Sequence, residues 1–277
     1  MDGIWRCLTS DRIEHFALFI ADYETIRAAE GRGSSDAAYY LALPWKDRSG
    51  ANQQQWSIRA KTYQYIERNI LSTMAARQGE PLRVLDLGAG NGWLSYRLAR
   101  MGHAPVAVDL LTNDRDGLGA ASHYAGSISP LFHRVQAEVD HLPFADASFN
   151  LVIFNSSFHY STDYIRTLRE ALRCTAPGGA VLIADTPWYL HESSGREMVE
   201  ERKTYFKRRF GFASDSVPSL EFLTDERINN LRSALKLDLT VHRPFYGVRW
   251  ALRPFLAKLR RRRSPSRFYI YKAQVAR

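Results

Sequence analysis

The stretch Val84–Leu94 reads VLDLGAGNGWL and decides the fold. Its apolar start is of strand type, the turn that follows holds Gly88, Gly90 and Gly92, and a helical pattern begins at Trp93. Glycine permits positive φ and a close approach of the backbone to a ligand. The first N–H groups of the helix favour an anion beside the same turn. The stretch therefore predicts a strand, a ligand-binding turn and a helix.

Outward from this stretch, short apolar runs alternate with helical segments. The predicted strands cover residues 82–87, 105–110, 131–137, 150–154, 180–184, 237–242 and 268–273. The clearest helices among them cover residues 93–101, 164–174 and 225–234. This alternation is typical of a parallel sheet that is covered on both faces. The sequence therefore predicts an α/β fold with seven strands.

Residues 1–80 predict a helical N-terminal cap or lid on a domain formed by residues 81–277. Apolar residues recur at helical spacing over residues 11–29 and 53–78, and Gly79 closes the second helix. Residues 30–52 are rich in Gly, Ser, Asp and Pro and predict an ordered loop. Aromatic residues of this block could wall a pocket for a flat or apolar molecule, or each could belong to the core of the cap: Tyr23, Tyr39, Tyr40, Trp45 and Trp56.

The chemistry of the glycine turn separates two kinds of cofactor. Its spacing is G-x-G-x-G, whereas the dinucleotide fingerprint is G-x-G-x-x-G. Asp86 stands directly before the turn, where its charge would repel a pyrophosphate and attract an ammonium or a sulfonium. S-adenosylmethionine carries both cations. A nicotinamide oxidoreductase is the competing interpretation.

VLDLGAGNG resembles the first motif of class I S-adenosylmethionine-dependent methyltransferases, in the methyltransferase type 11 or UbiE-like group. The resemblance continues in order from Leu82 to Asp185 and includes Ala137–Phe144 and Ala176–Gly179. It implies a Rossmann-like sheet of seven strands, mostly parallel with the last strand antiparallel, flanked by helices. The insertions in this domain are expected at about residues 186–222 and 247–266.

The resemblance also implies roles for individual residues around S-adenosylmethionine and its product S-adenosylhomocysteine. Asp109 ends the second strand and would accept both ribose hydroxyls. Glu138 stands where the family usually has Asp and would bind the adenine amino group, beside the N–H of Val139. Apart from the resemblance, the spacing Trp56-x-x-Arg59 places both side chains on one helix face, and Arg59 could pair with the cofactor's carboxylate. The complete predicted cofactor set is Arg59, Asp86, Gly88, Ala89, Gly90, Gly92, Trp93, Asp109, Leu110, Glu138, Val139 and Asn155.

Methyl transfer from a sulfonium is a displacement that depends on positioning and desolvation, so it requires no catalytic triad. A general base matters only when the accepting atom carries a proton. His159 follows the fourth strand and is the candidate catalytic base, with Tyr160 and Asn155 as weaker candidates. The alternative is that His159 only packs beside the cofactor.

The net charge of +9 is concentrated at the C-terminus. The last 31 residues carry ten Lys or Arg and no acid, which leaves the other 246 residues at a net charge of −1. Residues 250–263 form a basic amphipathic segment with Leu252, Leu256 and Leu259 on one stripe. Such a segment can be a solvated surface helix, lie on an anionic membrane or contact a nucleic acid. A nucleic-acid partner is the least favoured, because no RNA-binding module is recognisable.

The remaining composition narrows the class of protein. No apolar run approaches the roughly 20 residues that span a bilayer. Cys7 and Cys174 make neither a disulfide framework nor a metal cluster, so we expect no metal and a cytoplasmic location. The sequence predicts methyl transfer to a small-molecule acceptor, aromatic or lipid-like, mainly by proximity and orientation. The alternatives are an RNA or protein methyltransferase, or a cofactor-binding protein without transferase activity.

Overall fold

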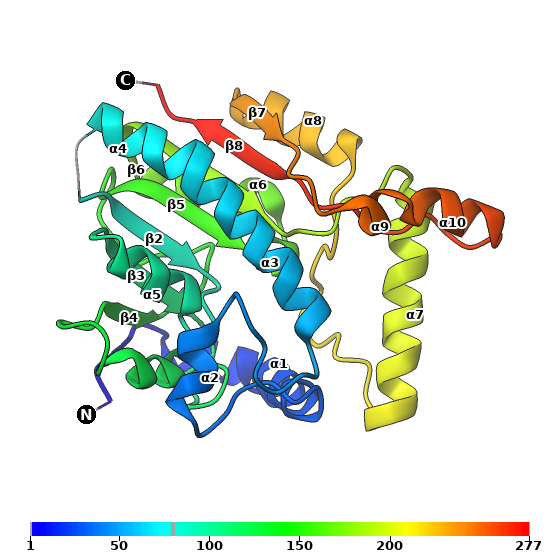
Figure 1. The fold of residues 1–277 in the computed structure, drawn as a ribbon, viewed down its shortest axis with the longest axis horizontal. Coiled ribbons are helices and arrows are strands. Elements are labelled where there is room, and N and C mark those ends of the chain that lie inside the picture. Colours follow the sequence, from blue (N-terminus) through cyan, green and yellow to red (C-terminus); the bar gives the residue numbers. More distant parts are fainter. Residues whose placement is uncertain (1, 79–80, 277) are drawn as a thin grey trace.

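The computed structural model describes residues 2–78 and 81–276, and its centre is one mixed sheet (Figure 1). The strand order is β1-β4-β3-β2-β5-β6-β8-β7. Strand β8 runs antiparallel to both of its neighbours, and the other pairings are parallel. The strands are β1 (Ile4–Arg6), β2 (Arg83–Leu87), β3 (Ala104–Asp109), β4 (His133–Gln136), β5 (Phe149–Asn155), β6 (Thr175–Ala184), β7 (Asp238–His242) and β8 (Ile270–Gln274). The predicted α/β fold with an antiparallel last strand is confirmed.

The described sheet has eight strands where the sequence predicts seven. The additional strand is β1, which pairs in parallel with β4 from Ile4 opposite Arg134 to Arg6 opposite Gln136. Three residues are too few to show an alternating pattern, and β1 exists because it covers the open edge of β4. The first residues of the chain therefore belong to the sheet and not to a wholly helical cap.

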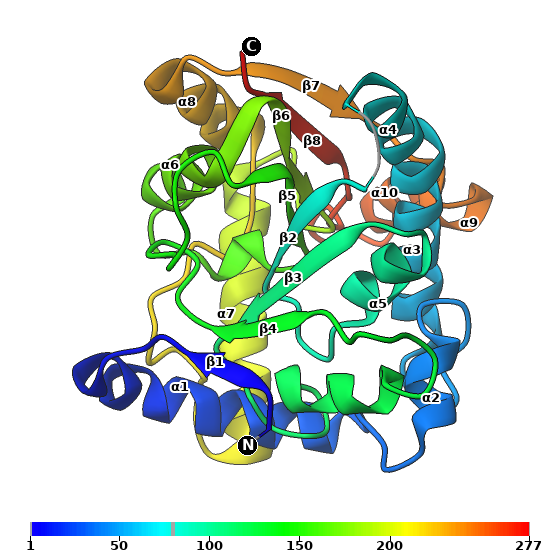
Figure 2. The ribbon, with the colours of Figure 1, turned by 90° about the vertical axis from the view of Figure 1, so that its left-hand side faces the viewer.

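Helices cover both faces of the sheet (Figure 2). One face carries α3 (Gln53–Ile66), α4 (Ser72–Gln78) and α5 (Trp93–Arg100), and the other carries α6 (Tyr164–Cys174) and α8 (Asp225–Leu235). In β5, Leu151 and Ile153 enter one core, while Val152 and Phe154 enter the other. Burial on both sides explains why the central strands read as continuous apolar runs.

The predicted helix over residues 53–78 is present as α3 and α4, joined by a π-helical turn, Glu67–Leu71. Its predicted end at Gly79 lies outside the described residues. The segment predicted as a loop, residues 30–52, contains the short helix α2 (Ala37–Ala42), whose N-terminus is capped by the carboxylate of Asp36. Because α2 is only six residues long and packs two tyrosines into the core, a propensity pattern could not reveal it.

The remaining elements lie around the carboxyl ends of the parallel strands. Helix α1 (Ser10–Ala29) follows β1, and a 3-10 segment, Leu118–Tyr124, follows β3. Helix α7 (Glu192–Phe210) follows β6. Strand β7 is parallel to β6, so it ends at this edge, and the antiparallel β8 starts there. The two helices between them, α9 (Val248–Ala251) and α10 (Arg253–Leu259), must stand at the same edge.

Candidate cofactor site

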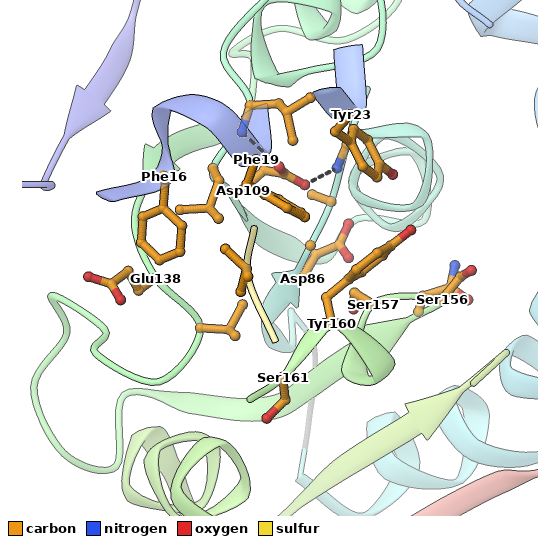
Figure 3. Close-up of a pocket in the computed structure, with 18 of the residues that line it drawn as sticks. Phe16, Phe19, Tyr23, Asp86, Asp109, Glu138, Ser156, Ser157, Tyr160 and Ser161 are labelled. Atoms are coloured by element: carbon orange, nitrogen blue, oxygen red, sulfur yellow. Dashed lines mark hydrogen bonds between the residues drawn. The ribbon is translucent and has the colours of Figure 1, made fainter. Parts of the chain in front are cut away.

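A cavity lies at the carboxyl ends of β2, β3 and β5, and α1 forms one of its walls (Figure 3). Phe16, Phe19 and Tyr23 project into it from α1, opposite Asp86 and Tyr160. Parallel strands bring their ends to one edge, which is where ligands bind in open α/β sheets.

Eleven of the twelve predicted cofactor residues line this cavity, and Gly92 does not. A Cβ atom on Gly92 would lie 2.9 Å from the ring of Phe132, so glycine is required there by internal packing. The residues that the structure brings together are Arg59, Asp86, Gly88, Ala89, Gly90, Trp93, Asp109, Leu110, Glu138, Val139 and Asn155. Their roles toward a cofactor remain predictions.

The glycine turn is held against the neighbouring strand. The N–H groups of Gly88 and Ala89 donate to the Val108 carbonyl at 2.8 and 3.0 Å. A Cβ atom on Gly88 would lie 2.3 Å from Cβ of Ser157, and its φ is +72°. The N–H of Gly90 donates to the carboxylate of the neighbouring strand end, at 2.7 Å. Close packing against Ser157 therefore requires glycine at position 88, and these three N–H groups already donate within the protein.

Two buried acids sit at the strand ends. Asp86 is 1% exposed and accepts a hydrogen bond from Ser95 Oγ at 2.8 Å. Burial raises the pKa of Asp86 to about 7. Asp109 accepts from Gly90 N at 2.7 Å and from Leu111 N at 2.8 Å, and burial raises its pKa to about 6. A cation placed between these carboxyls would favour their ionised forms.

The opposite charge in the cavity is Arg59 on α3. Its guanidinium contacts Ser156 Oγ at 3.3 Å and lies 4.8 Å from the ring centre of Trp56. No carboxylate of the described chain forms an ion pair with it, and burial lowers its pKa to about 10. Nearby, Asn155 Oδ1 is buried and receives no hydrogen bond from the described residues. The cavity thus holds an arginine that lacks an anion and an oxygen that lacks a donor.

The other charged side chains of the wall neutralise one another. Arg12 donates to both oxygens of Glu138 at 2.6 Å. Arg27 pairs with Asp116, which also accepts from Asn91. Arg166 and Asp140 form the third lining pair, at 3.1 Å. Arg59, Asp86 and Asp109 are the lining Arg, Asp and Glu side chains that no described ion pair neutralises.

Two of these pairs tie α1 to the strand ends. Their partners lie 126 and 89 residues apart in the sequence, so no local pattern could show them. The bidentate contact of Arg12 also means that the carboxylate of Glu138 already has a cationic partner. An adenine amino group would have to share that carboxylate with α1.

The candidate bases are placed differently from one another. His159 is partly buried and lies outside the cavity lining, and desolvation of its ring lowers its pKa to about 4. Its Nδ1 has no hydrogen-bond partner in the described part of the chain. Tyr160 and Asn155 do line the cavity, and burial raises the pKa of Tyr160. The geometry gives no support to His159 as a base, whereas Tyr160 lines the cavity.

The apolar wall differs from the predicted set of aromatics. Tyr23 and Trp56 line the cavity, whereas Tyr39 and Tyr40 are buried elsewhere and Trp45 is 42% exposed. These three are core or surface residues of the N-terminal block. The aromatic and apolar wall includes Phe16, Phe19, Tyr23, Trp56, Tyr160 and Val217.

Together, the sheet, the glycine turn and the acids near the ends of β2 and β3 resemble a class I methyltransferase domain. Residues 85–183 match the family described as methyltransferase domain, which confirms the resemblance seen in the sequence. A malonyl-[acyl-carrier protein] O-methyltransferase of Erwinia pyrifoliae is 37% identical over 113 residues, 39% of each chain. The ubiquinone/menaquinone biosynthesis C-methyltransferase UbiE of Vibrio vulnificus is 32% identical over 126 residues, 43% of this chain and 46% of the relative. The chain thus spans about half the length or less of these curated relatives.

A solved structure shows the same fold over most of the chain. The putative sarcosine dimethylglycine methyltransferase of Galdieria sulphuraria has a TM-score of 0.55 and 14% identity, and it covers 92% of this chain and 98% of its own. At this identity the likeness concerns the fold alone. In the described residues, no helix has both the length and the apolar character needed to cross a membrane.

Proposed function

We propose that the protein transfers the methyl group of S-adenosylmethionine to a small-molecule acceptor. One observation carries the proposal: Arg59, Asp86 and Asp109 remain without ion-pair partners in a wall whose other Arg, Asp and Glu side chains are paired among the described residues. S-adenosylmethionine offers a carboxylate for Arg59, an ammonium and a sulfonium for the neighbourhood of Asp86, and ribose hydroxyls for Asp109. Asn155 Oδ1 adds an acceptor for the ammonium.

The chain's own residues would act by holding and shielding the reactants. The bound cofactor supplies an activated methyl group, so the protein needs to orient the acceptor and exclude water. Arg59 would hold the carboxylate end, and Asp109 would hold the ribose. The rings of Phe19, Tyr23 and Tyr160 pack on one another with centres 5.8 to 6.3 Å apart and form an apolar wall beside Asp86.

That wall supports an aromatic or lipid-like acceptor. Aromatic side chains bind flat or apolar molecules by contact and give few polar groups that a nucleotide chain would need. Tyr160 is the residue that could hold a hydroxyl of the acceptor, because its phenol faces the cavity and stays protonated. The proposal favours a small molecule over an RNA or a protein, and over binding without transfer.

Isothermal calorimetry with S-adenosylhomocysteine and NAD tests the cofactor. We expect heat from S-adenosylhomocysteine, a large loss for Asp109→Asn, and no change for the exposed control Asp146→Asn. Incubation with methyl-labelled cofactor and a cell extract tests the transfer, and label should enter small molecules. Heat from NAD alone, or label only in RNA or protein, would reject the proposal.

We also propose that residues 250–263 bring the protein to an anionic membrane surface, since this segment carries six cations and no acid. A cytoplasmic location remains part of the proposal, and the free thiols of Cys7 and Cys174 are compatible with it.

A further inference from the structure

The segment between β7 and β8 carries a group of exposed apolar side chains, which we call the apolar tip. Its six members are 38% to 72% exposed: Phe245, Val248, Leu252, Phe255, Leu256 and Leu259. They come from α9, α10 and the residue stretch just before them. Exposed apolar side chains gathered on one segment mark an interaction site more often than single ones do.

The base of this segment is firmly held by the body of the protein. Lys61 Nζ donates to the Tyr246 carbonyl at 2.6 Å, and the Tyr246 hydroxyl lies 2.9 Å from Thr62 Oγ1. The ring of Trp250 stacks on Phe268 at 5.5 Å. Figure 1 shows α9 and α10 projecting from the side of the molecule. These contacts hold the segment at Tyr246 and Trp250, so α9 and α10 present the apolar tip as an ordered surface and not as a flexible loop.

Cations surround the apolar tip. No acidic residue occurs after Asp238, and Arg263 pairs with Glu201 on α7 at 2.7 Å. Across the described chain, the eight other cations of the segment form no ion pair: Arg243, Arg249, Arg253, Lys258, Arg260, Arg261, Arg262 and Arg267. A second copy of the tip would bring like charges together, and a nucleic acid would leave the apolar side chains without a partner. An anionic bilayer offers negative headgroups to the unpaired cations and an apolar interior to the exposed side chains of the tip.

We infer that the apolar tip inserts into the interface of an anionic membrane and holds the carboxyl edge of the sheet against it. The tip and the cavity share this edge, because β7 ends there and β8 begins there. The methyl acceptor would then reach the cavity from the lipid, and this statement alone rests on the proposed methyl transfer. Insertion of the tip itself does not depend on that function.

Flotation of the full chain with phosphatidylcholine vesicles, with or without phosphatidylglycerol, tests the inference. The double variant Phe255→Ser/Leu259→Ser removes two exposed side chains, and the control Trp5→Ser removes one that is 66% exposed on β1, the opposite edge of the sheet. We expect binding of the unmodified chain to anionic vesicles, a loss of about tenfold or more in the double variant and no loss in the control. At about 0.5 M salt the unmodified chain should keep part of its binding, because apolar insertion is not screened.

Three results would overturn the inference. The unmodified chain could fail to float with anionic vesicles, or the double variant and the control could bind alike. Light scattering could also show a dimer that Phe255→Ser/Leu259→Ser dissociates, which would assign the tip to a second copy. An unchanged circular dichroism spectrum in every variant verifies folding. If the folded chain floats with the vesicles but S-adenosylhomocysteine gives no heat, the proposed function fails and the membrane contact stands.

Discussion

Asp86→Asn should make the ligand-free protein more stable while it weakens cofactor binding. Burial raises the pKa of Asp86 from 3.8 to about 7, so its protonated form is favoured in the fold. The stabilising contribution of the neutral carboxyl is complete below about pH 4 and is lost as the pH rises through about 7. At about 1.36 kcal/mol per pKa unit, the ionised carboxyl costs about 4 kcal/mol at pH 8. Asparagine is neutral at every pH and avoids this cost.

Urea unfolding between pH 4 and pH 8, without cofactor, measures this effect. The free energy of unfolding of the unmodified chain should fall across that range relative to the variant, and the two should be similar near pH 4. Asp146→Asn is the control, because Asp146 is 79% exposed and lies outside the cavity lining. A variant that is no more stable at pH 8, with an unchanged pH profile, would refute the reasoning.

Other predictions concern the same site. The affinity for S-adenosylhomocysteine should increase about tenfold from pH 6 to pH 8, because the ionised fraction of Asp86 rises from about one molecule in ten to about nine in ten. Calorimetry measures this affinity, and an affinity that does not change with pH would contradict the prediction. Arg59→Gln should weaken S-adenosylhomocysteine by about tenfold or more and leave its decarboxylated analogue unaffected; equal losses would exclude a carboxylate contact. Arg12→Ala should increase amide hydrogen exchange in α1, since it breaks the bidentate pair with Glu138, and unchanged protection would mean that packing alone holds the helix. Urea unfolding should show that Gly88→Ala lowers the free energy of unfolding by about 2 kcal/mol more than Gly50→Ala does. Both glycines have a positive φ, but only at Gly88 would an added Cβ atom meet another residue within 4 Å.

The central sheet and the floor of the site could be predicted because their signals are local. Strands β2, β3 and β5 are largely buried on both faces, so each appears as a mostly apolar run. The glycines and acids of the site directly follow such runs, and parallel strands carry them to one edge. Asp86 and Asp109 could therefore be assigned to one cavity from the order of the chain alone.

The rest of the fold, and the wall that α1 adds to the site, depend on contacts that leave no local trace in the sequence. Strand β1 is too short to show a period, and α7 is a highly charged helix with only two buried residues, so its sequence lacks an apolar stripe. The contribution of α1 to the cavity follows from the pairs of Arg12 with Glu138 and Arg27 with Asp116. Such partners are chosen by tertiary packing. The sequence predicts the helix but not the surface that it covers.

The pairing of charges in the wall also bears on the competing dinucleotide interpretation. Three lining arginines are already held by acids, so Arg59 is the guanidinium that the described pairs leave for an incoming anion. A dinucleotide would bring two phosphates next to Asp86. The N–H groups that could donate to these phosphates belong to Gly88, Ala89 and Gly90, and they already donate to acceptors within the protein. Arg59 could pair with one phosphate, and the other would remain without a cationic side chain among the described lining residues, beside a buried acid. A ligand with a single carboxylate and one or two cations meets no such conflict, and this asymmetry favours a sulfonium nucleoside over NAD.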